Sequence, residues 1–141
     1  MTRAGLRVAA LVPNTVGAKF DCFRFGDMPF APPTGTYRLT GTIRLPPDRS
    51  TSIALFGEPS PQFVFERTGN GSMALHLQRD ARAGMTDFAH DYRVPVGDAD
   101  EVDVDLFADN GLVELSVGRG ILSATNLFFP DEPAGRVTFG R

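Results

Sequence analysis

The sequence predicts an all-β protein, built as a sandwich of two antiparallel sheets. Apolar and polar residues alternate with period two along most of the chain, and turn signals recur at intervals of about 8 to 12 residues. No long stretch has the 3.6-residue period of a helix. With 141 residues, the chain is long enough for one core. We expect a sandwich domain over residues 35–141, preceded by a strand or linker region over residues 1–34.

The first clear strand runs from Tyr37 to Leu45. Its odd-numbered positions are apolar or glycine, whereas the even-numbered positions carry Arg and Thr, so one face is expected to be buried. Pro46 and Pro47 end this strand. The proline-rich residues 27–35 before it are predicted to be a loop, and Ile53 to Phe56 is a short apolar run after it.

Two hairpins follow. In the first, Phe63–Arg67 and Met73–Leu77 alternate on either side of a turn at residues 68–71. The second is centred on Asn110-Gly111, the residue pair favoured in a two-residue type I′ turn. Folding there pairs Asp109 with Leu112 and places the valines and leucines of both arms on one face. A turn at Gly118–Gly120 and a strand from Ile121 to Phe129 complete the pattern.

Composition excludes several classes of function. The net charge is −3, which argues against nucleic acid as a partner. One cysteine and two histidines provide neither a disulfide framework nor a typical zinc site, and we expect no metal or cofactor. No apolar run reaches the roughly 18 residues of a membrane span, and Arg7 interrupts the apolar stretch near Met1, so we expect neither a membrane segment nor a signal peptide.

Carboxylates concentrate just before the second hairpin. A calcium site is one interpretation of the following acids, because hard cations bind several oxygens: Asp98, Asp100, Glu101, Asp103 and Asp105. Their spacing fits no calcium loop, and alternating acids on a strand are more typical of a solvent-exposed face. Asp105 and Glu114 share one hairpin face, as the paired acids of a glycosidase would, but nothing in the sequence builds a substrate pocket around them.

The remaining reactive side chains are interpreted structurally. His76 lies on the face opposite the apolar residues of its strand and is expected to be exposed or in an interface. His90 has Asp87 and Asp91 nearby, but no nucleophile motif accompanies it. Cys22, between Phe20 and Phe23, is expected to be a small buried apolar side chain.

The hairpin around Asn110-Gly111 and the strand after it resemble the C-terminal β-sandwich module of glycoside hydrolase family 32, which includes invertases, levanases, inulinases and other β-fructosidases. That family's pattern there is Asp-x-Ser-x-x-Glu-x-Phe-x-x-x-Gly, then a strand that carries Thr and ends in Phe-Pro. The matching positions are Asp109, Glu114, Gly120, Thr125, Phe129 and Pro130. Upstream, Leu77-Gln-Arg79 with Gly84 and Phe88 resembles the family's Leu-Asp-Arg-Ser-x-x-Gly segment. Gly111 and Ser116 depart from the pattern, which has Ser and Phe there.

This resemblance implies a concanavalin A-like jelly roll that lacks a catalytic site. The family's chemistry belongs to a five-bladed propeller, and at roughly 40–50 residues per blade this chain is too short to form one. The propeller motifs Asn-Asp-Pro-Asn-Gly, Arg-Asp-Pro and Glu-Cys are absent from the sequence. The resemblance therefore implies an accessory module that supports a catalytic propeller domain or contacts another subunit, with fructan or sucrose as a further candidate ligand.

Three alternatives stay open. The chain could act as a stand-alone, lectin-like carbohydrate-binding module, although it has no Trp and only two Tyr for stacking on sugars. It could be a complete small enzyme that uses Asp105, Glu114 or His90. It could also be a structural protein that self-associates through an edge strand.

Overall fold

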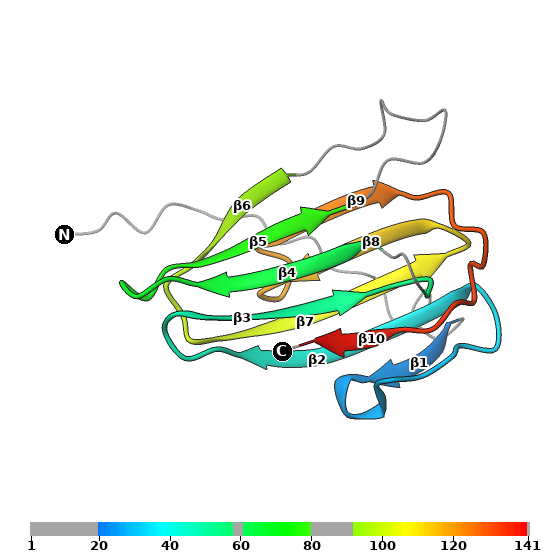
Figure 1. Cartoon of the computed structure of the whole chain (residues 1–141), viewed down its shortest axis with the longest axis horizontal. Helices are drawn as coiled ribbons and strands as arrows, with labels where there is room; N and C mark the ends of the chain where they lie inside the picture. The colour runs from blue at the N-terminus through cyan, green and yellow to red at the C-terminus, as the bar shows by residue number, and fades with distance from the viewer. Residues whose placement is uncertain (1–19, 58–60, 80–91, 141) are drawn as a thin grey trace.

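The computed structural model describes residues 20–57, 61–79 and 92–140, and these form two five-stranded sheets packed face to face (Figure 1). The first sheet has the order β1 (Asp21–Arg24), β2 (Thr36–Arg44), β7 (Glu101–Asp109), β8 (Leu112–Val117), β9 (Leu122–Leu127). The second has the order β10 (Thr138–Gly140), β3 (Arg49–Ala54), β4 (Gln62–Arg67), β5 (Met73–Gln78), β6 (Tyr92–Gly97). Neighbouring strands are antiparallel except β1 and β2. The predicted two-sheet, jelly-roll sandwich is confirmed.

The core lies between the sheets and is built from the alternating apolar positions. Leu39, Leu106 and Leu115 come from the first sheet, and Phe63 and Leu75 from the second; each is at most 1% exposed. Removing such a side chain from water contributes about 1.5–3 kcal/mol. The alternation that predicted the strands is therefore also the pattern that holds the two layers together.

The β7–β8 hairpin has the predicted register. Asp109 pairs with Leu112, and Leu106 pairs with Leu115. The turn residues Asn110 and Gly111 have φ values of 48° and 102°, both in the left-handed region that this turn needs. The β4–β5 hairpin is confirmed as well, with Arg67 paired with Met73 across the turn.

Other elements differ from the sequence prediction. β3 begins at Arg49, four residues before the predicted apolar run, because Ser50 and Ser52 lie on its outer face while Thr51 is buried. β9 spans only Leu122–Leu127 of the predicted 121–129. The short strands β1, β6 and β10 were not individually predicted, since all three lie at sheet edges and are only partly buried.

The segment before β2 closes one side of the sandwich. The 3-10 turn η1 (Phe25–Asp27) places the ring of Phe25 against Gly41 of β2, so closely that a Cβ there would lie 2.2 Å from the ring. Phe23 stacks on Phe30 with centroids 4.0 Å apart, and both rings meet Tyr37 edge-on. Residues 1–19 lie outside the described ranges, so the division at residue 34 stays a prediction.

Candidate functional site

The residues that carry the family resemblance lie at three places on the sandwich. Asp109, Phe129 and Pro130 lie at the end that holds the Asn110-Gly111 turn, where the Arg79 side chain also binds. Glu114 and Thr125 lie directly opposite each other on β8 and β9, both exposed. Gly120 lies in the β8–β9 turn at the other end, with a φ of 85°. The structure therefore brings four of the seven to one end. Gly84 and Phe88, which belong to the upstream part of the family resemblance, lie outside the described residues.

Contacts at the Asn110-Gly111 end are structural. The main-chain N–H of Phe128 donates to the carbonyl of Gly111 at 2.8 Å. A Cβ at Gly111 would lie 2.7 Å from the Phe128 carbonyl oxygen and 2.9 Å from Cδ of Pro130. The glycine that replaces the family's serine thus lets the chain after β9 pack directly on the turn.

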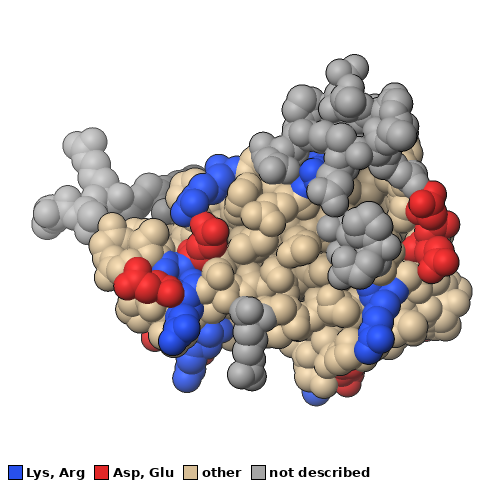
Figure 2. All heavy atoms as spheres, in the orientation of Figure 1, with Lys and Arg blue, Asp and Glu red and all other residues tan. Residues whose placement is uncertain are grey.

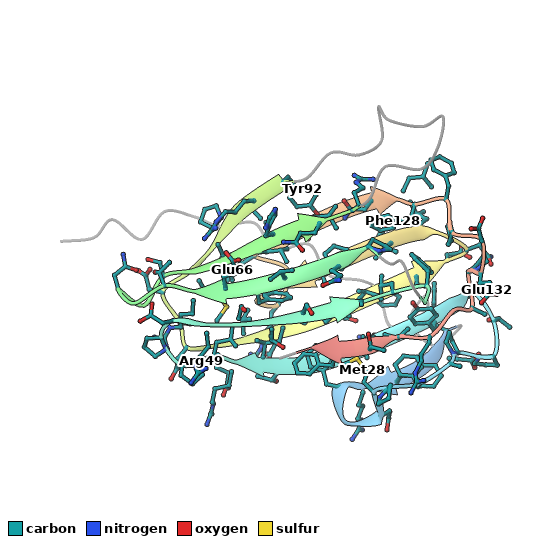
Figure 3. The ribbon with its side chains drawn as sticks, viewed as in Figure 1. Met28, Arg49, Glu66, Tyr92, Phe128 and Glu132 are labelled. Atoms are coloured by element: carbon teal, nitrogen blue, oxygen red, sulfur yellow. The ribbon has the colours of Figure 1, made fainter. Side chains whose placement is uncertain are left out.

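Arg79 links the two sheets at this end. Its Nη1 donates to the carbonyl of Leu127 at 3.1 Å, and its guanidinium lies 5.3 Å from the centroid of the Phe128 ring. Phe128 in turn packs edge-on against Phe63 of the second sheet. Figure 3 shows Phe128 and Tyr92 at this end of the sheets. Sequence analysis singled out Arg79 but not Phe128, whose role depends on contacts between the sheets that no local pattern encodes.

The carboxylates of β7 face arginine and threonine side chains of β2. Asp105 accepts hydrogen bonds from Nε and Nη2 of Arg38, at 2.9 and 2.7 Å, and Glu101 is paired with Arg44. Asp103 accepts from Oγ1 of Thr42 at 2.9 Å and from Nε of Arg119 at 3.1 Å. These two hydrogen bonds, that of Thr42 first, lower the pKa of Asp103. The predicted solvent-exposed acidic face is thus a ladder of paired charges.

The acids considered for catalysis or metal binding lie apart along the sheet. Asp105 accepts hydrogen bonds from Arg38, and Glu114 lies opposite Phe107, two residues further along the hairpin. Within residues 20–57, 61–79 and 92–140, no three His, Cys, Asp or Glu side chains gather closely enough to hold a metal ion. None of the helical segments in these ranges is long and apolar enough to cross a membrane.

One prediction about the reactive side chains is wrong. Cys22 is exposed, not buried, and its Sγ donates to the carbonyl of Phe20 at 3.3 Å. The reason is the two-residue alternation of β1, which turns Phe23 toward Phe30 and Tyr37 and leaves Cys22 on the outer side. His76 lies on the face of β5 opposite its apolar residues, as predicted, but it is half-buried and not exposed. His90 lies outside the described residues.

A half-open pocket of about 320 Å³ lies where the β6–β7 connection meets the β8–β9 turn. Its apolar wall includes Val96, Val117 and Leu122, and its rim carries Glu101 and Arg119. The described lining residues include no aromatic ring on which a sugar could stack. Glu101 is already paired with Arg44, and Arg119 with Asp103.

The two outer faces of the sandwich differ in charge. Over β3, β4 and β5, charged side chains gather toward the margins, and the centre of the face is largely uncharged (Figure 2). We call this centre the uncharged face; its residues are Ser52, Gln62, Val64, Ala74, His76 and Gln78. The alternation predicted that His76 lies on the outer face. The difference in charge between this face and the Arg–Asp pairs of β2 and β7 was not predicted, although the residues at the outward positions of these strands show it.

Comparison with known proteins identifies the fold. No protein-family model matches the sequence, and no curated protein sequence matches it. Among solved structures, the chain resembles sucrose-6-phosphate hydrolase from Lactobacillus gasseri with a TM-score of 0.63 and 19% identity, over 79% of this chain and 23% of that one. It resembles exo-inulinase from Aspergillus awamori with a TM-score of 0.62 and 19% identity, over 76% of this chain and 22% of that one.

Both structural neighbours are hydrolases, and an inulinase is among the enzymes named by the sequence resemblance. The resemblance is therefore confirmed at the level of the fold. This chain spans less than a quarter of the length of either neighbour.

Proposed function

We propose that this chain is a non-catalytic accessory module of a hydrolase related to the sucrose- and fructan-cleaving enzymes, and that its sandwich packs against a catalytic domain or another subunit. One observation carries this proposal. The structural match extends over 76–79% of this chain but only 22–23% of the two hydrolases. The shared fold is thus a minor part of each larger enzyme.

The state of the carboxylates supports a non-catalytic role. A glycosidase needs one acid that stays protonated near neutral pH and a second, ionised one across a substrate cleft. Here the pKa of Asp103 is lowered, and Asp105 accepts two hydrogen bonds from Arg38. Both groups serve to pair β2 with β7, a structural use of charge.

We assign the packing contact to the uncharged face. The centres of protein interfaces are depleted of charged residues, because charges lose hydration there without full compensation. Ser52, Val64 and His76 form one directly paired row across β3, β4 and β5, and all three are half-buried in this chain. Such a flat, neutral row suits contact with a second domain better than the paired charges of the opposite face do.

Affinity purification from the native cells, followed by an assay of fructose release from sucrose and inulin, tests this proposal. We expect the purified chain alone to release no fructose and the tagged chain to retain a fructose-releasing enzyme. Val64→Lys should remove that activity from the purified material, because it places a charge in the centre of the uncharged face. Ser116→Lys adds the same charge to the outer face of the other sheet and should leave it unchanged.

Two results would replace the proposal. Fructose release by the chain alone, lost in Glu114→Gln, would make it an enzyme. Saturable calorimetric binding of inulin or levan, with no co-purified activity, would favour the stand-alone carbohydrate-binding module instead.

A further inference from the structure

The edge strands of the two sheets are protected unequally. An edge strand presents main-chain groups that can pair with another chain, and charges, prolines or short length normally prevent this. β6 contains Pro95 and Arg93, β10 has three residues, and β1 has four with Asp21 and Arg24 exposed. β9 has six residues, Leu122–Leu127, without a charge or a proline. It is the least protected of the four edges in the part of the chain that the structure describes.

Exposed apolar side chains gather at this same edge. The large hydrophobic residues with high exposure are Leu112 (40%), Ile121 (51%), Leu127 (48%), Phe129 (36%) and Phe139 (38%). Ile121 directly precedes β9, Phe129 follows it closely, and Leu112 is paired with Leu127. Of these five, Phe139 alone belongs to the other sheet. Leu112 and Leu127 form an exposed apolar pair beside one end of β9, and Ile121 lies at its other end. Exposed apolar side chains at a strand edge suit an interaction site.

The main-chain groups of Ser123, Thr125 and Leu127 point away from β8. Phe128 directly follows β9, and its N–H donates to the carbonyl of Gly111 at the end of the β8–β9 ladder. The main-chain N–H and C=O groups of successive strand residues point to opposite sides, so those of every second residue before Phe128 point toward β8 and those of the residues between point away from it. In agreement with this, the carbonyl of Leu127 accepts a hydrogen bond from Arg79 on the side of β9 that faces away from β8. Ser123 and Thr125 therefore lie where an added strand would form its hydrogen bonds.

The outward-facing positions of this edge are symmetric about Ala124. Ile121 corresponds to Leu127, both apolar, and Ser123 corresponds to Thr125, both hydroxyl residues. In an antiparallel pair of two copies centred on Ala124, each Ser123 would face Thr125 of the second copy. Each Leu127 would face the second copy's Ile121. Thr–Ser and apolar cross-strand pairs are favourable, and no like charges meet.

From this symmetry we propose that β9 is the interface of a two-fold dimer, in which β9 pairs antiparallel with β9 of a second copy of this chain. The two first sheets become one continuous sheet, and Ser123 and Thr125 exchange main-chain hydrogen bonds across the axis. Leu112 and Leu127 of one copy and Ile121 of the second copy then form one apolar row on the outer face of the continuous sheet. This inference does not depend on the proposed function, since the uncharged face belongs to the other sheet.

Sedimentation velocity of the whole chain over about a hundredfold range of concentration tests the dimer, because an interface made by one strand is at the small, weak end of known interfaces. We expect the mass to double with rising concentration. The Ser123→Lys/Thr125→Lys variant places lysines opposite lysines, and its dimerisation should weaken at least tenfold. Mixing it with Ser123→Glu/Thr125→Glu should restore a dimer that contains one copy of each.

The matched control is Ala31→Lys/Ser50→Lys, which adds the same charge at two exposed positions outside both β9 and the uncharged face. Its dimerisation should equal that of the unchanged chain, and circular dichroism should show the same fold in every variant. The inference is wrong if the chain is monomeric throughout. It is equally wrong if the lysine variant dimerises as well as the control, or if mixing the lysine and glutamate variants forms no mixed dimer.

Discussion

Arg38 of β2 binds Asp105 of β7 diagonally across the sheet, not the residue directly opposite it. Phe107 occupies the opposite position, and the Arg38 guanidinium lies 4.9 Å from the centroid of that ring while it forms both hydrogen bonds to Asp105. One side chain thus covers an outward-facing phenylalanine and pairs the strands. The ring of Phe20 packs edge-on against Phe107 as well, with centroids 5.1 Å apart, and Phe107 is therefore buried on the outer face, with 6% exposure.

We therefore expect Arg38→Lys to cost about 0.5–1 kcal/mol of unfolding free energy, measured by urea denaturation. Lysine keeps the charge but lacks the planar fork that binds a carboxylate twice and stacks on a ring. Arg44→Lys is the control, because Arg44 and Glu101 are more exposed (75% and 44%) and their pair should contribute little. Equal losses in the two variants would contradict this account.

Gly41→Ala should destabilise the protein by about 1–3 kcal/mol, since the new Cβ would lie 2.2 Å from the Phe25 ring. In a Phe25→Ala background the ring is gone, and the same substitution should cost almost nothing. Urea denaturation of the four proteins gives the coupling energy of this double-mutant cycle. Gly26→Ala is the control, because a Cβ added at Gly26 would meet no atom within 4 Å. Additive losses would show that the ring is not the obstacle.

The fold was largely predictable because most strands are long enough to show their alternation. In β2, β7 and β8, apolar residues recur at alternate positions and face the core. The Asn110-Gly111 turn then fixes the register between β7 and β8. β10 has only three residues, too few to show alternation. β6 alternates between half-buried and exposed residues, but it contains Pro95, and a proline within a run argues against a strand. The ring of Phe25 over Gly41 is a contact between distant segments, which no local pattern contains.

The candidate surfaces were less predictable than the fold. The partner of Asp103 is Arg119, from the β8–β9 turn, and the partner of Asp105 is Arg38, 67 positions earlier in the sequence. Sequence reasoning could place these acids on the outer face but could not find their partners, which depend on strand order. Cys22 was misplaced because its two phenylalanine neighbours suggested burial, whereas only Phe23 turns inward.

Asp103→Asn should lower stability near pH 6 by a few tenths of a kcal/mol, and the difference should vanish in acid. The hydrogen bonds from Thr42 and Arg119 lower the pKa of the folded carboxyl below its ordinary value of 3.8. The stabilisation is therefore present above that value and is lost as the pH falls through the folded pKa. The effect is small because the Asp103 side chain is 45% exposed. Urea denaturation at pH 6 and pH 3 measures it. Thr42→Val should reduce the same difference, and a gap that does not narrow between pH 6 and pH 3 would contradict the assignment.

Tyr37→Phe should leave stability at pH 7 unchanged or raise it by up to about 1 kcal/mol. The Tyr37 hydroxyl is buried and has no hydrogen-bond partner among residues 20–57, 61–79 and 92–140, so its removal abolishes a desolvation cost and breaks no bond within them. Burial also raises the pKa of Tyr37 far above its ordinary value of 10.0. Above pH 10 the unfolded chain therefore loses a proton that the folded chain keeps, which costs about 1.4 kcal/mol per pH unit.

Tyr37→Phe has no hydroxyl to titrate and should not lose this stability. The difference in unfolding free energy between Tyr37→Phe and the unchanged protein should therefore grow steadily between pH 10 and pH 11. Tyr37→Leu is the contrasting variant. It also lacks the hydroxyl but loses the edge-on contacts with Phe23 and Phe30, and it should cost about 1–3 kcal/mol at pH 7. Thermal unfolding across this pH range separates the two contributions. A Tyr37→Phe protein that is less stable than the unchanged protein at pH 7 would contradict this account.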